Sequence, residues 1–179
     1  QRNVFASAEM PTGLGGYIVQ TTDTNALITV TLKATDTMDY SVTKLTLFHA
    51  RAEETFDFAI FDSSMHEIGY MRTSSASEYP FTTEFRFPVP MSKFIIKPCP
   101  RDSSRMCARI FGMLLENERH GLLYNTIGVN GAEFRHYNNS PYFFEQLKYL
   151  DPDLVILSLG TNEAFNWKGF KRESFYAEI

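Results

Sequence analysis

Two short polar turns carry the residues of this sequence that could stabilise a developing negative charge. The first is Gly128-Val-Asn-Gly131 and the second is Gly160-Thr-Asn-Glu163. Acyl transfer needs hydrogen-bond donors aimed at an oxyanion, and a backbone N–H at a glycine turn and an asparagine amide can both serve. Gly131 and Asn162 are therefore candidate oxyanion-stabilising residues. Alternatively, both segments are ordinary strand-to-helix turns, with glycine for backbone freedom and asparagine as a helix cap.

The first turn follows a strand candidate at 122–127, and the second follows an apolar run without polar alternation at 154–157. Such a run is typical of a strand buried on both faces of a parallel sheet. Ligands bind at the carboxyl ends of the strands in open α/β sheets, so we expect the two turns to lie together at one edge. The sequence thus predicts an active-site edge that presents Gly131 and Asn162.

A helix is predicted between these two strands. Ser140-Pro141 supplies an N-cap residue and a proline at the first helical position. Four apolar residues follow at helical spacing: Phe143, Phe144, Leu147 and Leu150. Asp151-Pro152-Asp153 ends this helix, and another is expected from about Glu173. Because a parallel strand pair must be covered on both faces, residues 121–179 are expected to be part of a larger α/β domain.

The first two thirds of the chain has a different pattern. Short alternating runs are separated by turn-forming stretches, at 26–33, 42–52, 56–61, 83–89, 94–97 and 108–115. This spacing predicts an antiparallel β-sandwich of about seven strands over residues 26–120. Residues 1–25 are expected to be a connector. Their Gly13-Leu-Gly-Gly16 segment lacks a preceding strand and a following Lys-Ser/Thr, so no phosphate-binding loop is expected.

Charge and composition exclude several classes of partner. The 17 basic and 21 acidic residues give a net charge of −4 with the signs interspersed, so no basic face for nucleic acid is expected. No apolar run is long enough to span a bilayer. Cys99 and Cys107 match no zinc pattern, and no metal or cofactor is expected. The two cysteines could form a disulfide across a turn or remain free thiols.

The two turns and the strands before them resemble the SGNH (GDSL-type) hydrolases. Asn125-Thr-Ile-Gly-Val-Asn-Gly131 is similar to the family's second block, whose glycine donates a backbone N–H to the oxyanion hole. Ser158-Leu-Gly-Thr-Asn-Glu-Ala164 is similar to the third block, whose asparagine donates its side-chain amide. The order of segments resembles bacterial peptidoglycan O-acetylesterases, which carry an inserted sandwich similar to a carbohydrate-binding module. The resemblance implies that Gly131 and Asn162 are catalytic residues of the oxyanion hole.

The resemblance also implies a fold of two kinds, α/β plus all-β. A jelly-roll-like antiparallel sandwich would be followed by part of a flavodoxin-like three-layer α/β/α hydrolase domain. The family's nucleophile lies in a Gly-Asp-Ser block and its base in an Asp-x-x-His block. The sequence contains no Gly-Asp-Ser and no histidine after His136. We therefore expect an internal fragment that is inert alone, with the nucleophile upstream and the base downstream.

Glu133 and His136 form a second, weaker candidate site. Three residues apart on a helix, they would share a face, and a carboxylate can orient an imidazole. Without a nucleophile such a pair has nothing to activate, and surface pairs of this kind are common. The other histidines are expected to be structural or solvated: His49, His66 and His120.

Aromatic residues suggest a function of another class. Exposed rings on the sandwich could stack on sugars, and the candidates are Tyr40, Tyr70, Tyr79 and Phe81. Three aromatic residues near Asn162 either line a substrate cleft or pack the following helix: Phe165, Trp167 and Phe170.

Three functions remain open from the sequence. The first is part of a periplasmic or secreted bacterial serine esterase that hydrolyses ester groups, chiefly O-acetyl, on a carbohydrate such as peptidoglycan. The second is a non-catalytic glycan-binding sandwich with the α/β segment as scaffold. The third is a degenerate esterase that serves as an adaptor.

Overall fold

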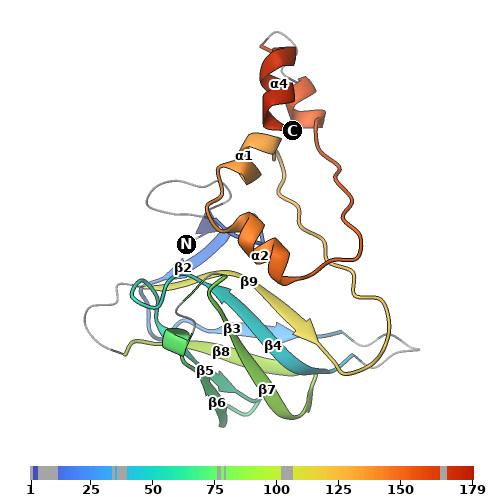
Figure 1. Cartoon of the computed structure of the whole chain (residues 1–179). Helices are drawn as coiled ribbons and strands as arrows, with labels where there is room; N and C mark the ends of the chain where they lie inside the picture. Colours follow the sequence, from blue (N-terminus) through green and yellow to red (C-terminus); the bar gives the residue numbers. More distant parts are fainter. Residues whose placement is uncertain are drawn as a thin grey trace.

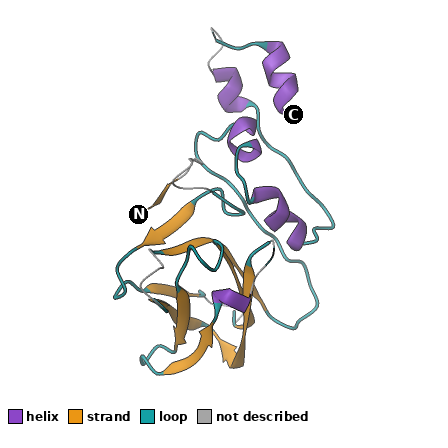
Figure 2. Cartoon of the chain, turned by 60° about the vertical axis from the view of Figure 1, so that its left-hand side comes forward, coloured by secondary structure: helices purple, strands orange, loops and turns teal. Residues whose placement is uncertain are grey.

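A two-sheet β-sandwich at one end and short helices at the other make up the chain (Figures 1 and 2). The computed structural model describes residues 2–3, 12–33, 35, 40–75, 78, 80–101, 107–165 and 169–179. All strand pairs among these residues are antiparallel. The predicted antiparallel sandwich is therefore confirmed.

The larger sheet has the strand order β1-β2-β9-β4-β7 and the smaller sheet the order β3-β8-β5-β6. The strands of the larger sheet are Arg2–Asn3 (β1), Ile18–Thr21 (β2), Ala108–Glu116 (β9), Val42–His49 (β4) and Thr82–Met91 (β7). Those of the smaller sheet are Ile28–Thr31 (β3), Lys93–Cys99 (β8), Asp57–Phe61 (β5) and Glu67–Met71 (β6). A single 3₁₀ turn, η1 (Thr73–Ser75), follows β6.

Three strands differ from the sequence-based expectation. Strand β1 lies in the expected connector and pairs with β2. Strand β2 lies within the expected connector of residues 1–25, yet Val19 pairs with Ile110 in the larger sheet. Strand β6 was not predicted, and it pairs with β5 at the edge of the smaller sheet. Its sequence, Glu-Ile-Gly-Tyr-Met, has a glycine and a register shift opposite Ile60 and Phe61, which breaks the regular alternation.

Alternate side chains of both sheets build the core between them. Leu45 and Leu47 of β4 are fully buried there, facing Phe58 and Ile60 of β5. Successive side chains of a strand point to opposite faces, so this spacing of two residues places each pair on the inner face. The sandwich thus has the core that its alternating pattern predicts.

A second core lies on the outer face of the larger sheet, where helix α2 (Phe143–Tyr149) packs. Phe48 and Phe111 are buried in it. Tyr142 stacks on Phe111 with ring centroids 4.8 Å apart, and Tyr149 meets Phe48 edge-on at 5.5 Å. Aromatic contacts of this geometry stabilise the fold beyond the free energy that comes from burying their apolar area. Helix α2 is therefore joined to the sandwich by a shared hydrophobic core.

Polar contacts fix the loop at residues 12–16 against α2. The buried Gln146 side chain accepts a hydrogen bond from Leu14 N–H at 2.8 Å and donates one to Pro80 C=O at 3.4 Å. A Cβ at Gly13 would lie 2.4 Å from Gln146 Oε1 and 2.7 Å from Phe111 Cβ. The glycine-rich loop therefore serves close packing between the larger sheet and α2.

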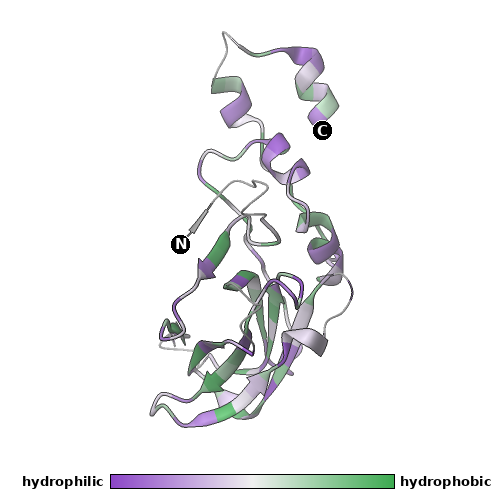
Figure 3. Ribbon diagram, turned by 90° about the vertical axis from the view of Figure 1, so that its left-hand side faces the viewer, coloured by the Kyte–Doolittle hydropathy of each residue, from purple (hydrophilic) through white to green (hydrophobic). Residues whose placement is uncertain are grey.

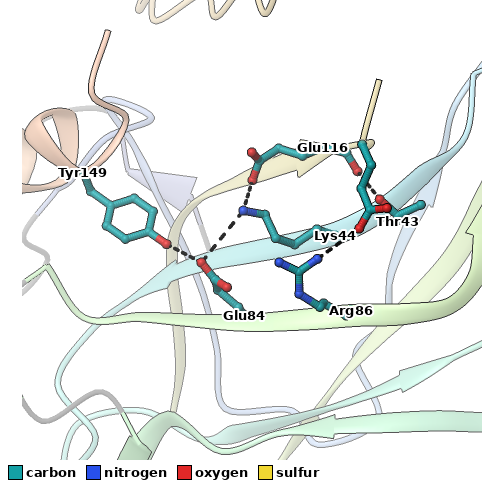
Figure 4. A network of polar contacts seen from close by, with 7 residues as sticks. Thr43, Lys44, Glu84, Arg86, Glu116 and Tyr149 are labelled. Atoms are coloured by element: carbon teal, nitrogen blue, oxygen red, sulfur yellow. Dashed lines mark hydrogen bonds and ion pairs between the residues drawn. The ribbon is translucent and has the colours of Figure 1, made fainter. Parts of the chain in front are cut away.

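A charged network borders α2 on the same face of the sheet (Figure 4). Lys44 Nζ lies 2.7 Å from a Glu116 carboxylate oxygen and 3.9 Å from one of Glu84. The hydrogen bond to Glu116 is the largest of the effects that raise the pKa of Lys44. Tyr149 O–H donates to Glu84 at 2.6 Å, so the helix takes part in the network.

The apolar runs at 122–127 and 154–157 form no strands, contrary to expectation. Both run from the sandwich toward the distant helices (Figure 1), but no backbone hydrogen bond joins them among the described residues. Most of their side chains are exposed, Leu122 by 94%, Leu154 by 75% and Ile156 by 77%, although Ile127 packs against the core on the outer face of the larger sheet. A strand needs a neighbour for its backbone groups, and the described residues supply none. The predicted flavodoxin-like layers are therefore not present in this part of the chain.

Three further helices lie beyond α2, away from the sandwich (Figure 3): α1 (Phe134–Asn138), α3 (Thr161–Phe165) and α4 (Arg172–Glu178). Helices α2 and α4 match the predicted ones closely. Helix α2 begins at Phe143, however, and Ser140 does not cap it. The buried Ser140 hydroxyl donates to Thr12 C=O at 2.7 Å instead.

Replacing Gln146 tests how α2 is held. Gln146→Met keeps the approximate volume but leaves the buried Leu14 N–H without its acceptor, which should cost about 1–3 kcal/mol of unfolding free energy. Urea unfolding monitored by far-UV circular dichroism measures this loss. The neighbouring variant Glu145→Ala affects only an exposed pair with Lys148 and should stay within about 0.5 kcal/mol of wild type. Equal midpoints for both variants would contradict the assignment.

His49 makes the stability depend on pH. Its ring is fully buried, with Nδ1 2.7 Å from Ala50 C=O and Nε2 2.8 Å from Thr83 Oγ1. Nδ1 must therefore carry the proton and Nε2 must accept the Thr83 hydroxyl proton. Burial lowers the pKa of His49 from 6.5 to about 4. As the pH falls from about 6.5 toward 4, His49 is therefore protonated in the unfolded chain but stays neutral in the folded one.

The stabilisation from neutral His49 should be complete above pH 6.5 and fall on acidification, by on the order of 2 kcal/mol at pH 5. Urea unfolding at pH 7 and pH 5 measures the fall. In His49→Gln this part of the pH dependence should vanish, whereas in His120→Gln, which changes an exposed histidine, it should remain. A His49→Gln variant with the wild-type pH dependence would refute the assignment.

Candidate functional site

The turns that carry Gly131 and Asn162 lie together, as the sequence predicts. Asn162 Nδ2 donates a hydrogen bond to Ala132 C=O at 2.7 Å, across 30 positions of the sequence. In the next residue, Glu163 Oε1 accepts a hydrogen bond from Phe134 N–H at 2.7 Å. Two successive side chains of α3 thus hold the turn that leads into α1.

Backbone conformation explains the glycine at position 131. Gly131 has a φ of +81°, which side-chain-bearing residues rarely adopt, while a Cβ there would meet nothing within 4 Å. The position is exposed, and among the described residues no acceptor pairs with the Gly131 N–H. An amide at such an open turn can donate to an incoming group. Asn162 holds the adjacent residue, so its amide lies beside the same turn.

The alternative role of Asn162 as a helix cap differs from the observed contact. Its amide donates to a carbonyl of the first turn, whereas a capping side chain accepts from N–H groups of its own helix. Asn162 therefore links two segments. It retains a second amide N–H, because a carboxamide nitrogen carries two.

Glu133 and His136 do not form a carboxylate–imidazole pair. The carboxylate of Glu133 accepts from Arg135 Nε at 2.5 Å, and His136 Nδ1 accepts from Glu133 N–H at 2.9 Å. Burial, and next the charge of Arg135, lowers the pKa of His136. These contacts close the first turn of α1, so this pair has a structural role.

A small hollow lies behind the turns, between the loop at residues 12–16 and α1. Its volume of about 210 Å³ includes open solvent, and it is lined by Thr12, Gly16, Val129, Ala132, His136, Tyr137 and Ser140. Ligand sites for small molecules usually enclose about 300–1,000 Å³. Because much of its space is open solvent, the hollow does not enclose a ligand-sized cavity.

Several other candidates have structural roles or lie outside the described residues. Phe81 is buried and packs against Tyr142, so it is not a stacking surface. Tyr40 and Tyr70 are exposed as expected, each by 42%. Tyr79 and Trp167 lie outside the described residues.

Cys99 and Cys107 are free thiols, which decides between the two alternatives left by the sequence. Within the described ranges, no group of three or more His, Cys, Asp or Glu side chains could hold a metal ion. No helix there is long and apolar enough to cross a membrane.

Sequence reasoning missed one polar cluster, which surrounds Asp57 on the smaller sheet. The fully buried carboxylate of Asp57 accepts two hydrogen bonds from Thr73, from its N–H and from its hydroxyl, both at 2.9 Å. Tyr70 O–H donates to the other carboxylate oxygen at 3.3 Å, and Arg101 Nη1 lies 3.7 Å away. The only signal in the sequence was an acidic residue at the start of an apolar strand, which by itself indicates nothing.

Comparisons with known proteins give little further guidance. No family model matches the sequence, and no curated protein matches it. Among solved structures, the chain is similar to the family 32 carbohydrate-binding module from Streptococcus pneumoniae EndoD, with 12% identity and a TM-score of 0.33. The alignment covers 63% of this chain and 73% of that one. A likeness this distant identifies neither a ligand nor a reaction.

Glu163 offers a direct test of the contact between the turns. Glu163→Ala removes the acceptor for Phe134 N–H, a hydrogen bond to a charged group worth about 1.5–3 kcal/mol. Native-state hydrogen exchange should therefore show the Phe134 amide exchanging at least about tenfold faster. Glu163→Gln keeps an acceptor oxygen and should retain most of the protection. Unchanged exchange in Glu163→Ala would show that the turns do not depend on this contact.

Proposed function

We propose that this chain contributes the oxyanion-stabilising part of an SGNH-type serine esterase. Its substrate would be an ester, chiefly O-acetyl, on a carbohydrate such as peptidoglycan, which places the protein in the periplasm or outside the cell. The observation that carries the proposal is the hydrogen bond from Asn162 to Ala132, next to Gly131. It brings together the two donors that the resemblance assigns to one oxyanion hole.

In the proposed reaction, a serine hydroxyl attacks the ester carbonyl while a histidine, oriented by an aspartate, accepts the serine proton. Negative charge develops on the former carbonyl oxygen. The serine N–H, the Gly131 N–H and the Asn162 amide would donate hydrogen bonds to this oxygen and lower the barrier. The proposal places the serine and the histidine in segments of the protein outside these 179 residues.

Asn162→Ala tests the role of the amide. In the full protein that contains this chain, the substitution should lower kcat for an aryl acetate by about a hundredfold or more, because one oxyanion donor is lost. KM should change little, since the donor acts on charge that develops in the transition state. Initial rates of phenolate release, measured by spectrophotometry over a range of substrate concentrations, give both constants.

Asn139→Ala is the matched control, because Asn139 is an exposed residue at the end of α1. It should keep the wild-type kcat. Equal turnover by Asn162→Ala and wild type would remove Asn162 from the mechanism. A full protein without esterase activity on any aryl ester would refute the proposed reaction and favour the adaptor hypothesis.

A second candidate function is glycan binding by the sandwich. The observation that favours it is the pair of exposed tyrosines on the sandwich, Tyr40 and Tyr70, because carbohydrate recognition commonly uses exposed aromatic rings. The two functions are compatible within one protein. A glycan-binding sandwich would hold the polymer while the esterase acts on its substituents.

A further inference from the structure

The outer face of the smaller sheet is a second place where a ligand could bind. Helix α2 packs on the larger sheet, and the smaller sheet lies on the far side of the sandwich from it (Figure 1). Tyr70, Ala59 and Lys97 are cross-strand partners on β6, β5 and β8, so they form one row on one face. Ala59 does not belong to the core cluster between the sheets, so this row faces outward.

The Tyr70 ring lies along this face. Ala59 faces outward beside Tyr70 and is only 1% exposed, so this part of the face is covered rather than bare. The Tyr70 hydroxyl donates to Asp57, two positions along β5 from Ala59, which ties down the far end of the ring. Burial and the nearby Asp57 raise the pKa of Tyr70, so the hydroxyl keeps its proton. A ring held at both ends, with 42% of the residue exposed, is a preorganised flat surface.

Hydrogen-bonding groups lie near the hydroxyl end of the ring, because Tyr70 and Arg101 both approach Asp57 Oδ2. Arg101 Nη1 donates a short hydrogen bond to Ser74 Oγ on η1 and lies 3.7 Å from Asp57, while its side chain remains 40% exposed. The Asp57 carboxylate holds η1 through Thr73, which sets the position of Ser74. Arg101 and Lys97 are the cations near this ring, and Asp57 and Glu67 are the carboxylates. Burial is the main cause that raises the pKa of nearby Cys99, and the charges of Glu67 and Asp57 add to it. Among the described residues the charges near the ring are therefore balanced, which suits a neutral, hydroxyl-rich ligand.

We propose that Tyr70, Arg101 and Ser74 form a binding site for a neutral pyranose ring of a polysaccharide. The apolar face of the sugar would stack on the Tyr70 ring. Arg101 would donate to a sugar hydroxyl, and the Ser74 hydroxyl would donate or accept. This site rests on the second candidate function and is independent of the esterase chemistry at Gly131 and Asn162.

The test is a saturation-transfer NMR titration of the 179-residue chain with soluble hexasaccharides of glucose, xylose and mannose. A single aromatic platform should bind at least one of them with a millimolar Kd. Tyr70→Ala should weaken that binding at least about tenfold, equivalent to about 1.4 kcal/mol. Tyr124→Ala is the matched control, because Tyr124 is an exposed tyrosine outside the sandwich, and it should bind as wild type does. Tyr40→Ala tests the other exposed tyrosine of the sandwich.

Tyr70→Phe guards against a folding defect, because it keeps the ring and removes only the hydroxyl. It should bind within about threefold of wild type, with thermal melts showing that each variant is folded. Binding that survives Tyr70→Ala would overturn this site but leave glycan binding in place. Binding lost only in Tyr40→Ala would move the site to Tyr40. No binding to any of the three sugars would overturn both the site and the second candidate function, while leaving the esterase proposal untouched.

Discussion

The attachment of α2 to the outer face of the larger sheet is the constraint on which the rest of the chain depends. Its apolar part is the stacking of Tyr142 on Phe111 and the contact of Tyr149 with Phe48. Its polar part is the buried Gln146, which satisfies the Leu14 N–H. Hydrophobic contact alone would allow the helix to shift along the sheet. The buried hydrogen bond fixes one position, because any shift of the helix would leave a buried polar group unpaired. Helix α2 is thus the main attachment of the segment after residue 120, assisted by the hydrogen bonds from Tyr17 to Gly128 and between Thr12 and Ser140.

Much of the sandwich could be predicted because its signal is local. Alternation places Leu45 and Leu47 on one face, and the same period appears in β5 and β9. The strands that escaped prediction have weaker local signals. Strand β2 follows three glycines that pack closely against residues distant in the sequence, such as Gly13 against Gln146 and Gly16 against Val129. The Asp57 cluster likewise joins β5, β6 and η1, and no spacing of residues along the chain predicts it.

At the two turns, the sequence predicts the residues of the site but not the elements that position them. Its glycine and asparagine stand out in the sequence, and the structure brings them together. The strands expected to do so are not formed. Helix α3 does it instead, through the side chains of Asn162 and Glu163. The apolar pattern correctly identified segments suited to burial, but periodicity describes what a segment can do in a sheet and not whether a partner strand is at hand. That depends on tertiary contacts.

The two exposed apolar runs also have a practical consequence. Leu122 and the segment from Leu154 to Leu157 present apolar side chains to solvent, and no backbone hydrogen bond joins them within the described part of the chain. Such segments add readily to any extended strand that they meet, including the same segment in another copy of the chain. Purified at high concentration, these 179 residues should self-associate through the runs, and a charged residue at Ile156 should raise their solubility. Helix α2 covers the outer face of the larger sheet, so a variant with charged residues in both runs and α2 retained should remain monomeric.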